Sequence, residues 1–267
     1  MSASGKSPPL NVNNWTPILV EDFDTDVPMG QVIGSSAYAD KISAFPTGWR
    51  TSKPWQTGMY DNSRLEVKDS CLITHVATIT DARGTAPRVT TILPKLSTDR
   101  QYRVSHGRFT VRFRADEIPG YKIAWMLWPI SDAVWPAGGE IDFPEQCLRA
   151  TNMVSGFMHR QDATEGGDQN WAKGASSACD GDWHTATITW KPGGWRTAEC
   201  TFGWDGVQIG HFTDRVPVGP MRWGLQTEPD LHPKFLGYIN GKRTYAKPDP
   251  AVAGIIEVDW IVAYRAN

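Results

Sequence analysis

Three acidic residues lie close together in one short segment of the chain. Glu140 and Asp142 are two positions apart, so on a β-strand both side chains leave the same face. Regular alternation would return to that face at position 144, but the third acid is Glu145, and Pro144 cannot donate a ladder hydrogen bond. The sequence therefore predicts a β-bulge at Phe143-Pro144 that turns Glu145 back towards the other two acids.

This spacing is suited to hydrolysis of a glycosidic bond. With the bulge absorbing one residue, the Cα atoms of Glu140 and Glu145 are separated by roughly 13 Å, at ~3.3 Å for each strand residue. Two glutamate side chains that lean together then reach the ~5–5.5 Å carboxyl separation of a retaining glycosidase. Three acids on one face repel one another, so we expect at least one to be protonated near neutral pH, as a general acid must be. Asp142, between the two glutamates, is expected to hydrogen-bond one of them.

An ordinary solvent-exposed strand face or a calcium loop would also gather acidic residues. An exposed face usually mixes charges of both signs, whereas residues 135–146 include no base. A calcium loop carries its ligands on a turn with Gly and Asn, not on an apolar strand with Ile, Phe and Pro. The spacing favours catalysis over both of these interpretations.

The elements that would position the acids are β-strands. Apolar and polar residues alternate over 107–116 and 183–190, and over 256–264 the alternation places the apolar residues on one face and the acids on the other. Residues 65–76 are typical of two strands around a turn, and Asp205-Gly206 is typical of a hairpin turn. Many strands, frequent turns and little helical pattern predict an all-β sandwich of two antiparallel sheets.

Composition excludes several classes of function. The 267 residues carry 27 basic and 29 acidic side chains, a net charge of −2, which gives no long-range attraction to nucleic acid or to an anionic membrane. No apolar run is long enough to span a membrane. The four cysteines form no close pair, which excludes the common zinc patterns. The 13 tryptophans suit a core or the stacking of sugar rings.

We expect two parts in the chain. Residues 1–17 are predicted to be a flexible N-terminal arm, and residues 18–267 a single domain, because no linker or repeat divides them. The first nine residues carry no apolar secretion signal.

At the acidic cluster the chain resembles glycoside hydrolase family 16. Glu140-Ile-Asp-Phe-Pro-Glu145 is similar to the E-x-D-x-x-E signature of that family in its bulged form. Segments in the same order along the chain resemble other family segments: Glu21-Asp-Phe23, Trp125-Met-Leu-Trp128-Pro129, Trp135-Pro-Ala-Gly-Gly139, Asp182 to Trp190 and Val258 to Tyr264.

The resemblance implies a β-jelly-roll sandwich whose concave sheet forms a substrate cleft. It implies endo-hydrolysis of a β-linked glucan or galactan with retention of configuration. By position, Glu140 would be the nucleophile, Glu145 the general acid/base, and Asp142 a hydrogen-bonding partner of the nucleophile. The bulged signature is that of laminarinase-like and agarase-like members, whereas lichenases carry the shorter E-x-D-x-E.

Further residues are candidates for contact with sugar. Tryptophans beside the catalytic strand are expected either to form sugar platforms or to pack in the core, and the resemblance adds a histidine on the adjacent strand, a loop tryptophan and a glutamine in place of an asparagine. These candidates are Trp125, Trp128, Trp135, His159, Trp171 and Gln226.

The resemblance also implies a structural Ca²⁺ on the convex side. Glu21 and Asp259 match the carboxylate positions of that site, and Ser70 would supply a main-chain carbonyl. No cofactor is expected for catalysis.

Together these observations predict an extracellular, monomeric, endo-acting retaining hydrolase of a polysaccharide, with β-1,3-glucan as first substrate and no nucleic-acid or membrane partner. Mixed-linkage glucan, an agar- or carrageenan-type galactan, transglycosylation on the same scaffold, and a non-catalytic sugar-binding jelly roll are the alternatives. Residues 229–250 match no familiar segment of the family.

Overall fold

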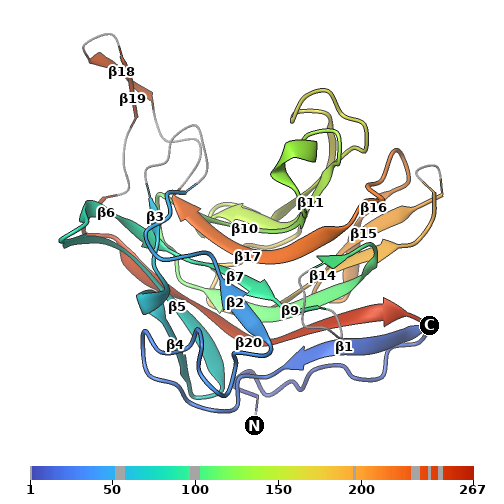
Figure 1. Cartoon of the computed structure of the whole chain (residues 1–267), viewed down its shortest axis with the longest axis horizontal. Helices are drawn as coiled ribbons and strands as arrows, with labels where there is room; N and C mark the ends of the chain where they lie inside the picture. The colour runs from blue at the N-terminus through green and yellow to red at the C-terminus, as the bar shows by residue number, and fades with distance from the viewer. Residues whose placement is uncertain are drawn as a thin grey trace.

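The protein is a sandwich of two β-sheets packed face to face (Figure 1). The structure, a computed structural model, describes residues 2–51, 58–96, 103–194, 197–229, 235–239, 242–245 and 249–267. Most of residues 229–250, the unfamiliar stretch of the sequence, lies outside these ranges or is described in its backbone alone.

The first sheet has ten strands and a path β16-β15-β14-β9-β20-β5-β6-β3, with β1 paired to β20 and β4 paired to β5. Its strands are β1 (Trp15–Glu21), β3 (Met59–Tyr60), β4 (Leu65–Lys68), β5 (Cys71–Asp81), β6 (Gly84–Val89), β9 (Gly107–Ala115), β14 (His184–Lys191), β15 (Glu199–Trp204), β16 (Val207–Phe212) and β20 (Ala253–Ala266).

The second sheet has eight strands and a path β13-β12-β11-β10-β17-β7-β2, with β8 paired to β17. Its strands are β2 (Ile42–Ala44), β7 (Thr91–Pro94), β8 (Arg103–Val104), β10 (Tyr121–Pro129), β11 (Glu140–Cys147), β12 (Ser155–His159), β13 (Gln169–Lys173) and β17 (Met221–Pro229).

Helix is nearly absent from the described residues. Two short 3₁₀ turns occur, η1 (Asn62–Arg64) and η2 (Asp132–Val134), and a two-stranded hairpin of β18 (Phe235–Ile239) and β19 (Lys242–Tyr245) projects from the sandwich (Figure 1). Within the described ranges, no helix has the length and apolarity needed to cross a bilayer. The predicted all-β sandwich of two antiparallel-rich sheets is confirmed.

Alternation along the strands fills the space between the sheets. Phe109 and Phe113 on β9 face inwards as predicted, and the Phe113 ring packs against Trp125 of the opposite sheet with centroids 4.4 Å apart. Trp190 and Trp223 are also buried in this core. Aromatic residues therefore supply much of the apolar area that holds the two sheets together.

Strand β20 does not keep one apolar face, contrary to the alternation predicted for 256–264. Its register against β9 shifts between Val258 and Trp260, so Val258 points into the main core while Trp260 and Tyr264 point to the other face of the sheet. A β-bulge inserts one residue and reverses the alternation beyond it. Sequence alternation alone does not reveal this, because apolar residues continue on both sides of the shift.

The N-terminal segment, predicted to be a flexible arm, lies against that second apolar face in this structure. The Ser4 hydroxyl accepts a hydrogen bond from Arg112 Nε at 2.6 Å, and the Trp260 indole N–H donates to the Lys6 carbonyl at 2.7 Å. Arg112 is only 4% exposed as a result, although its position on β9 was predicted to be solvent-exposed. Strand β1 begins at Trp15, inside the predicted arm.

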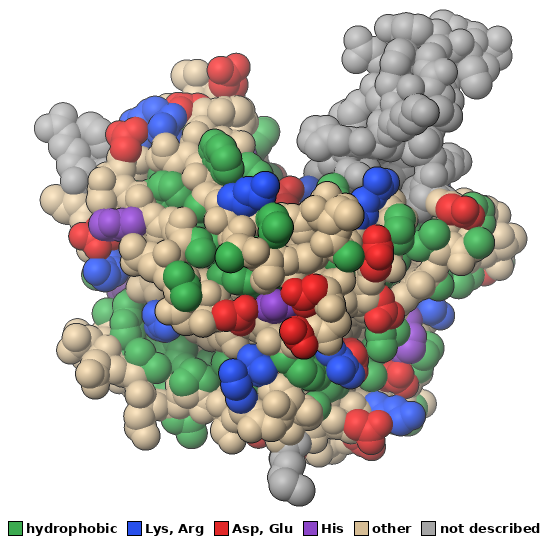
Figure 2. All heavy atoms as spheres, turned by 180° about the vertical axis from the view of Figure 1, so that it is seen from behind, with side chains coloured by type: hydrophobic (Ala, Val, Ile, Leu, Met, Phe, Trp, Pro, Cys, Tyr) green, Lys and Arg blue, Asp and Glu red, His purple; other side chains and the backbone are tan. Residues whose placement is uncertain are grey.

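The molecular surface mixes charges. Acidic and basic side chains are interspersed over the face in Figure 2, with hydrophobic side chains scattered between them. The four cysteines, Cys71, Cys147, Cys179 and Cys200, form no disulfide.

Candidate active site

Strand β11 carries all three acidic residues. Asp142 pairs with Phe157 of β12 and Glu145 pairs with Ser155. The chain therefore advances three residues along β11 where it advances only two along β12. The same one-residue excess occurs against β10 on the other side. The β-bulge predicted at Phe143-Pro144 is therefore confirmed, and it returns Glu145 to the face of the other acids.

That face is the outer side of the eight-stranded sheet, here called the site face. Ile141 and Phe143, which alternate with the acids, are buried in the core between the sheets. Strand pairing aligns residues of the site face in rows across the sheet. The row through Asp142 contains Trp171, Phe157, Asp142, Met126 and Gly224, and the row through Glu145 contains Lys173, Ser155, Glu145, Ala124, Gln226 and Thr91.

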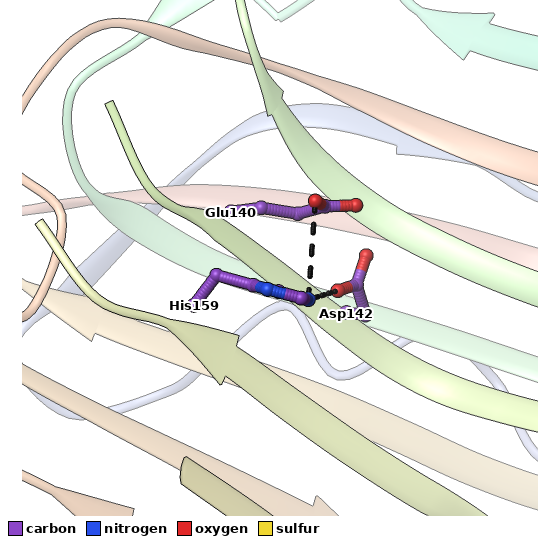
Figure 3. A group of neighbouring side chains, drawn as sticks. All are labelled: Glu140, Asp142 and His159. Atoms are coloured by element: carbon purple, nitrogen blue, oxygen red, sulfur yellow. Dashed lines mark ion pairs between the residues drawn. The ribbon is translucent and has the colours of Figure 1, made fainter. Parts of the chain in front are cut away.

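Glu140, Asp142 and His159 converge at one point (Figure 3). His159 Nε2 lies 3.2 Å from Asp142 Oδ2 and 3.9 Å from Glu140 Oε2. His159 Nδ1 lies 2.6 Å from the Gly166 carbonyl, which only accepts, so Nδ1 carries a proton and donates it there. The imidazole is thus fixed in orientation with Nε2 towards the carboxyl groups.

Burial disfavours the ionised form of these two carboxyl groups. The pKa of Glu140 is raised well above its usual value, first by burial and then by the neighbouring Asp142. The pKa of Asp142 is also raised, by burial and by the charge of Glu145. The expectation that the clustered acids hold a proton near neutral pH agrees with these directions. The ligand atoms of Glu140, Asp142 and His159 lie within 4.8 Å of one another, a closeness that shared protons explain without an ion.

An aromatic pair borders Glu140. The Trp135 indole N–H donates to Glu140 Oε2 at 2.9 Å, and its ring stacks on Trp128 with centroids 5.8 Å apart and planes 18° apart. Trp135 is 38% exposed, so part of its side chain is accessible to a ligand. The Trp128 indole N–H is held by Asp132 at 2.8 Å.

Glu145 has a cationic partner that the sequence reasoning missed. Lys122 Nζ lies 2.7 Å from Glu145 Oε1, with the lysine side chain 9% exposed and the glutamate side chain 25% exposed. Strand parity places Lys122 on the site face with Ala124 and Met126, a signal available in the sequence. Its partner could not be identified from the sequence, because the pairing of β10 with β11 is not encoded locally.

A cavity of about 350 Å³ adjoins Glu145 on the side of β12 and β13. It is within the ~300–1,000 Å³ range of small-molecule sites. Its lining combines polar and apolar side chains: Glu145, Gln146, Cys147, Thr151, Asn152, Met153, Ser155, Phe157 and Lys173.

The other predicted sugar contacts have different environments. Trp125 is 2% exposed and belongs to the core, so the prediction that it contacts sugar is wrong; strand parity places it opposite to the acids. Trp171 is 64% exposed on edge strand β13, in the row of Asp142. Gln226 is 7% exposed, in the row of Glu145.

The residues predicted to bind calcium have protein partners in this structure. Glu21 Oε2 lies 2.6 Å from Lys41 Nζ, so an ammonium group already neutralises it. Asp259 accepts the Ser2 hydroxyl at 2.6 Å and the Ala3 N–H at 2.9 Å. Ser70 is in the left-handed region, with φ 59°. A lysine and the N-terminal segment thus contact the two carboxylates in this structure, and the Ca²⁺ site that the resemblance implies stays a prediction.

Comparison with solved structures shows which proteins share this fold. The catalytic domain of an endo-1,3-β-glucanase (laminarinase) from Thermotoga petrophila RKU-1 is 18% identical, with a TM-score of 0.69 over 96% of this chain and 100% of that chain. A non-specific endo-β-1,3(4)-glucanase from family GH16 is 16% identical, with a TM-score of 0.70 over 100% of this chain and 97% of that one.

A third similar structure is described in connection with endo-acting O-glycanases of the human gut microbiota that initiate mucin breakdown. It is 14% identical, with a TM-score of 0.67 over 97% of this chain and 94% of that chain. No family model matches the sequence. No curated protein matches it either. At these identities the similarity establishes the fold, and the jelly roll that the resemblance to glycoside hydrolase family 16 implied is confirmed.

Proposed function

We propose that this chain is an endo-acting, retaining glycoside hydrolase of a β-linked glucan, with laminarin-type β-1,3-glucan as its first substrate. One observation carries the proposal. Glu140, Asp142 and Glu145 lie on one accessible face of a single bulged strand, within a fold shared with endo-1,3-β-glucanases. A sugar-binding protein without catalytic activity has no use for three mutually repelling acids in that arrangement.

In the first step, Glu140 attacks the anomeric carbon while protonated Glu145 donates its proton to the oxygen that leaves. The bond from the anomeric carbon to the leaving oxygen breaks as the bond to the Glu140 carboxylate forms. In the second step, Glu145 as carboxylate takes a proton from water, and that water displaces Glu140 from the sugar. Two inversions at the anomeric carbon retain its configuration.

The environment of Glu140 supports the role of nucleophile. The Trp135 N–H donates to its carboxylate and His159 lies nearby, and both lower the pKa that burial raises. Asp142 lacks an indole donor of this kind and has a buried oxygen, Oδ1, without a hydrogen-bond partner. The hydrogen bond between the two carboxyl groups raises the pKa of Glu140 and lowers that of Asp142. A nucleophilic Glu140 therefore requires the proton of this pair to pass to Asp142, which then donates a hydrogen bond beside the nucleophile.

The substrate would lie across the site face. The accessible ring of Trp135 and the exposed ring of Trp171 offer apolar surfaces for sugar rings on either side of β11. The cavity beside Glu145 would take the sugar next to the acid/base, and Gln226 would offer polar contact on the other side of that residue. Action on a polysaccharide is consistent with an extracellular, monomeric enzyme without a catalytic cofactor, as the sequence led us to expect.

A second class of substrate is favoured by one comparison. The fold is also shared with a structure described in connection with mucin O-glycanases, and galactans such as agar or carrageenan are alternatives from the bulged signature. The scaffold therefore does not distinguish glucan from other β-linked glycans, and transglycosylation uses the same nucleophile with sugar replacing water.

The proposal is tested by release of reducing ends from laminarin, mixed-linkage glucan, agar, carrageenan and mucin O-glycans. We expect endo-type products from laminarin, their loss in Glu140→Gln, and NMR of the first product showing the β-anomer. Glu199→Gln, at an exposed site on β15, is the matched control and should retain full activity. Unaltered hydrolysis by Glu140→Gln, or no release of reducing ends from any polymer by the wild-type protein, would contradict the proposal.

A further inference from the structure

A chain of charged and polar groups runs from Glu145 across two strands. Lys122 on β10 pairs in register with Cys147 of β11 on one side and Glu228 of β17 on the other. Glu228 is fully buried, and its Oε1 accepts a hydrogen bond from the Tyr60 hydroxyl at 2.7 Å. The lysine ammonium therefore lies between two carboxyl groups, and the inner carboxyl is itself fixed from the opposite sheet.

Lys122 is held in its charged form. Burial by itself would lower its pKa, but the pKa is raised, because the charge and hydrogen bond of Glu145 and the charges of Glu228 and Asp142 outweigh burial. A buried lysine without such partners tends to lose its proton. The structure instead places a charged ammonium group 2.7 Å from the carboxyl of the proposed acid/base.

Several other polar or charged groups surround Glu145. Its own strand contributes Asp142 and Cys147, β12 contributes Ser155 directly opposite and His159 further along, and β13 contributes Lys173, which shares the cavity. In contrast to these groups, Lys122 donates a hydrogen bond to a Glu145 oxygen within the described residues. Lys173 is exposed to solvent, where its effect is screened.

We infer that Lys122 is a positioning residue for the acid/base: its ammonium holds Glu145 by Oε1, leaves Oε2 for the reacting oxygen, and opposes protonation of the carboxylate. This inference rests on the proposed function, in which Glu145 must be protonated in the first step and ionised in the second. The ammonium favours the second state. Glu145 must therefore take up its proton beside a neighbouring cation.

Kinetics over a pH range test this inference. In Lys122→Met the alkaline limb of kcat/KM should move upwards by about 1–3 pH units, the size of effect that an opposite charge at this distance has on a carboxyl group. At the optimum, kcat should fall about tenfold, because Glu145 loses its fixed orientation. Lys122→Arg keeps the cation and should keep the wild-type limb. Lys191→Met, which breaks an exposed Lys–Glu pair on the other sheet, should change neither quantity.

Removing Lys122 alone takes a positive charge from the surroundings of the buried Glu228, which endangers folding. The double variant Lys122→Met/Glu228→Gln removes both charges and should show the same shift of the limb. An unchanged limb in folded Lys122→Met or in the double variant would overturn the inference.

A second measurement does not depend on activity. In protein labelled at the glutamate carboxyl carbons, the signal lost in Glu145→Gln identifies Glu145, and its pH midpoint should be higher in the double variant than in wild type. An equal midpoint overturns the inference. A shifted midpoint in a protein that cleaves none of the polymers would support the Lys122 pairing and contradict the proposed hydrolase.

Discussion

Glu140 combines two opposing requirements in one side chain. In its proposed role as nucleophile Glu140 must be ionised, yet burial raises its pKa, and the indole N–H of Trp135 is a donor that favours the charge. Trp135 thus has two roles, because its ring also stacks on Trp128 and is partly exposed. A substitution that separates the hydrogen bond from the ring distinguishes these roles.

Trp135→Phe retains an aromatic ring and removes the N–H. A hydrogen bond to a charged group contributes about 1.5–3 kcal/mol, so kcat should fall by about 10–100-fold. The KM should change little, because the ring still offers an apolar face to sugar. Steady-state kinetics on the best polymer of the panel measure both quantities, with Trp49→Phe, an exposed indole outside the acidic cluster, as control. Wild-type kcat in Trp135→Phe would refute this role of the N–H.

Residue types revealed the acids but not all of their partners. Glu140, Asp142 and Glu145 could be identified because their spacing has a meaning within one strand. The Trp125 environment could not be distinguished from that of Trp128 by composition, although strand parity separates them. The Lys122–Glu145 pair depends on which strands are neighbours, and pairing between strands is a long-range property.

At the scale of elements, the bulge in β11 depends on what packs behind it. Phe143 stacks on Phe202 of β15 with ring centroids 4.9 Å apart and planes 12° apart. Gly156 of β12 lies against both rings: a Cβ there would be 2.6 Å from Phe202 Cδ2 and 2.8 Å from Phe143 Cδ2. The absence of a side chain at Gly156 lets the rings seat directly beneath the bulge.

Gly156→Ala should therefore destabilise the protein and disturb the site together. Overpacking of this kind costs about 1–3 kcal/mol, and displacement of Phe143 would move Glu145, two residues further on. Chemical denaturation measures the free energy of unfolding, and activity at a permissive temperature measures the second effect. Gly167→Ala is the matched control, because nothing lies within 4 Å of its added Cβ. Equal stability of the two variants would contradict this account.

Element prediction succeeded where a breaker residue marks the irregularity and failed where none does. Pro144 indicates the bulge in β11, since proline has no N–H to donate to a neighbouring strand. The shift in β20 between Val258 and Trp260 has no such marker, because both faces of that strand are covered by apolar material. The cover is the N-terminal segment, whose small polar sequence is typical of a free terminus and whose order comes from contacts with β20 and Arg112.

For the whole molecule, the raised pKa values link the site to stability. The pair of Glu140 and Asp142 holds a proton in the folded protein over a pH range in which the unfolded chain has released it, because both pKa values are raised. Stability falls with rising pH wherever the folded state binds more protons. The site therefore lowers the free energy of unfolding progressively, from the ordinary carboxyl range of about pH 4 up to the raised pKa of the pair.

Glu140→Gln should accordingly be more stable than wild type at neutral pH. The gain should be about 1.4 kcal/mol for each unit by which the Glu140 pKa is raised, and it should vanish near pH 4, where the side chain is protonated in both states. Thermal unfolding of both proteins from pH 4 to pH 8 measures the difference. Glu199→Gln, which removes an exposed carboxylate with a lowered pKa, should show no such gain. A pH-independent difference for Glu140→Gln would contradict the linkage.

The bulge of β11 also has a consequence for how the sequence can change over evolutionary time. In most strands, deletion of one residue inverts every following side chain. Here, loss of Pro144 would leave Glu-Ile-Asp-Phe-Glu, in which plain alternation already places all three acids outwards and Phe143 inwards. The pairing of Asp142 with Phe157 and of the last acid with Ser155 would then have no excess residue on either strand. The long and short forms of this acidic signature are thus neighbours separated by one codon, and a lineage can pass between them without an intermediate that buries its acid/base.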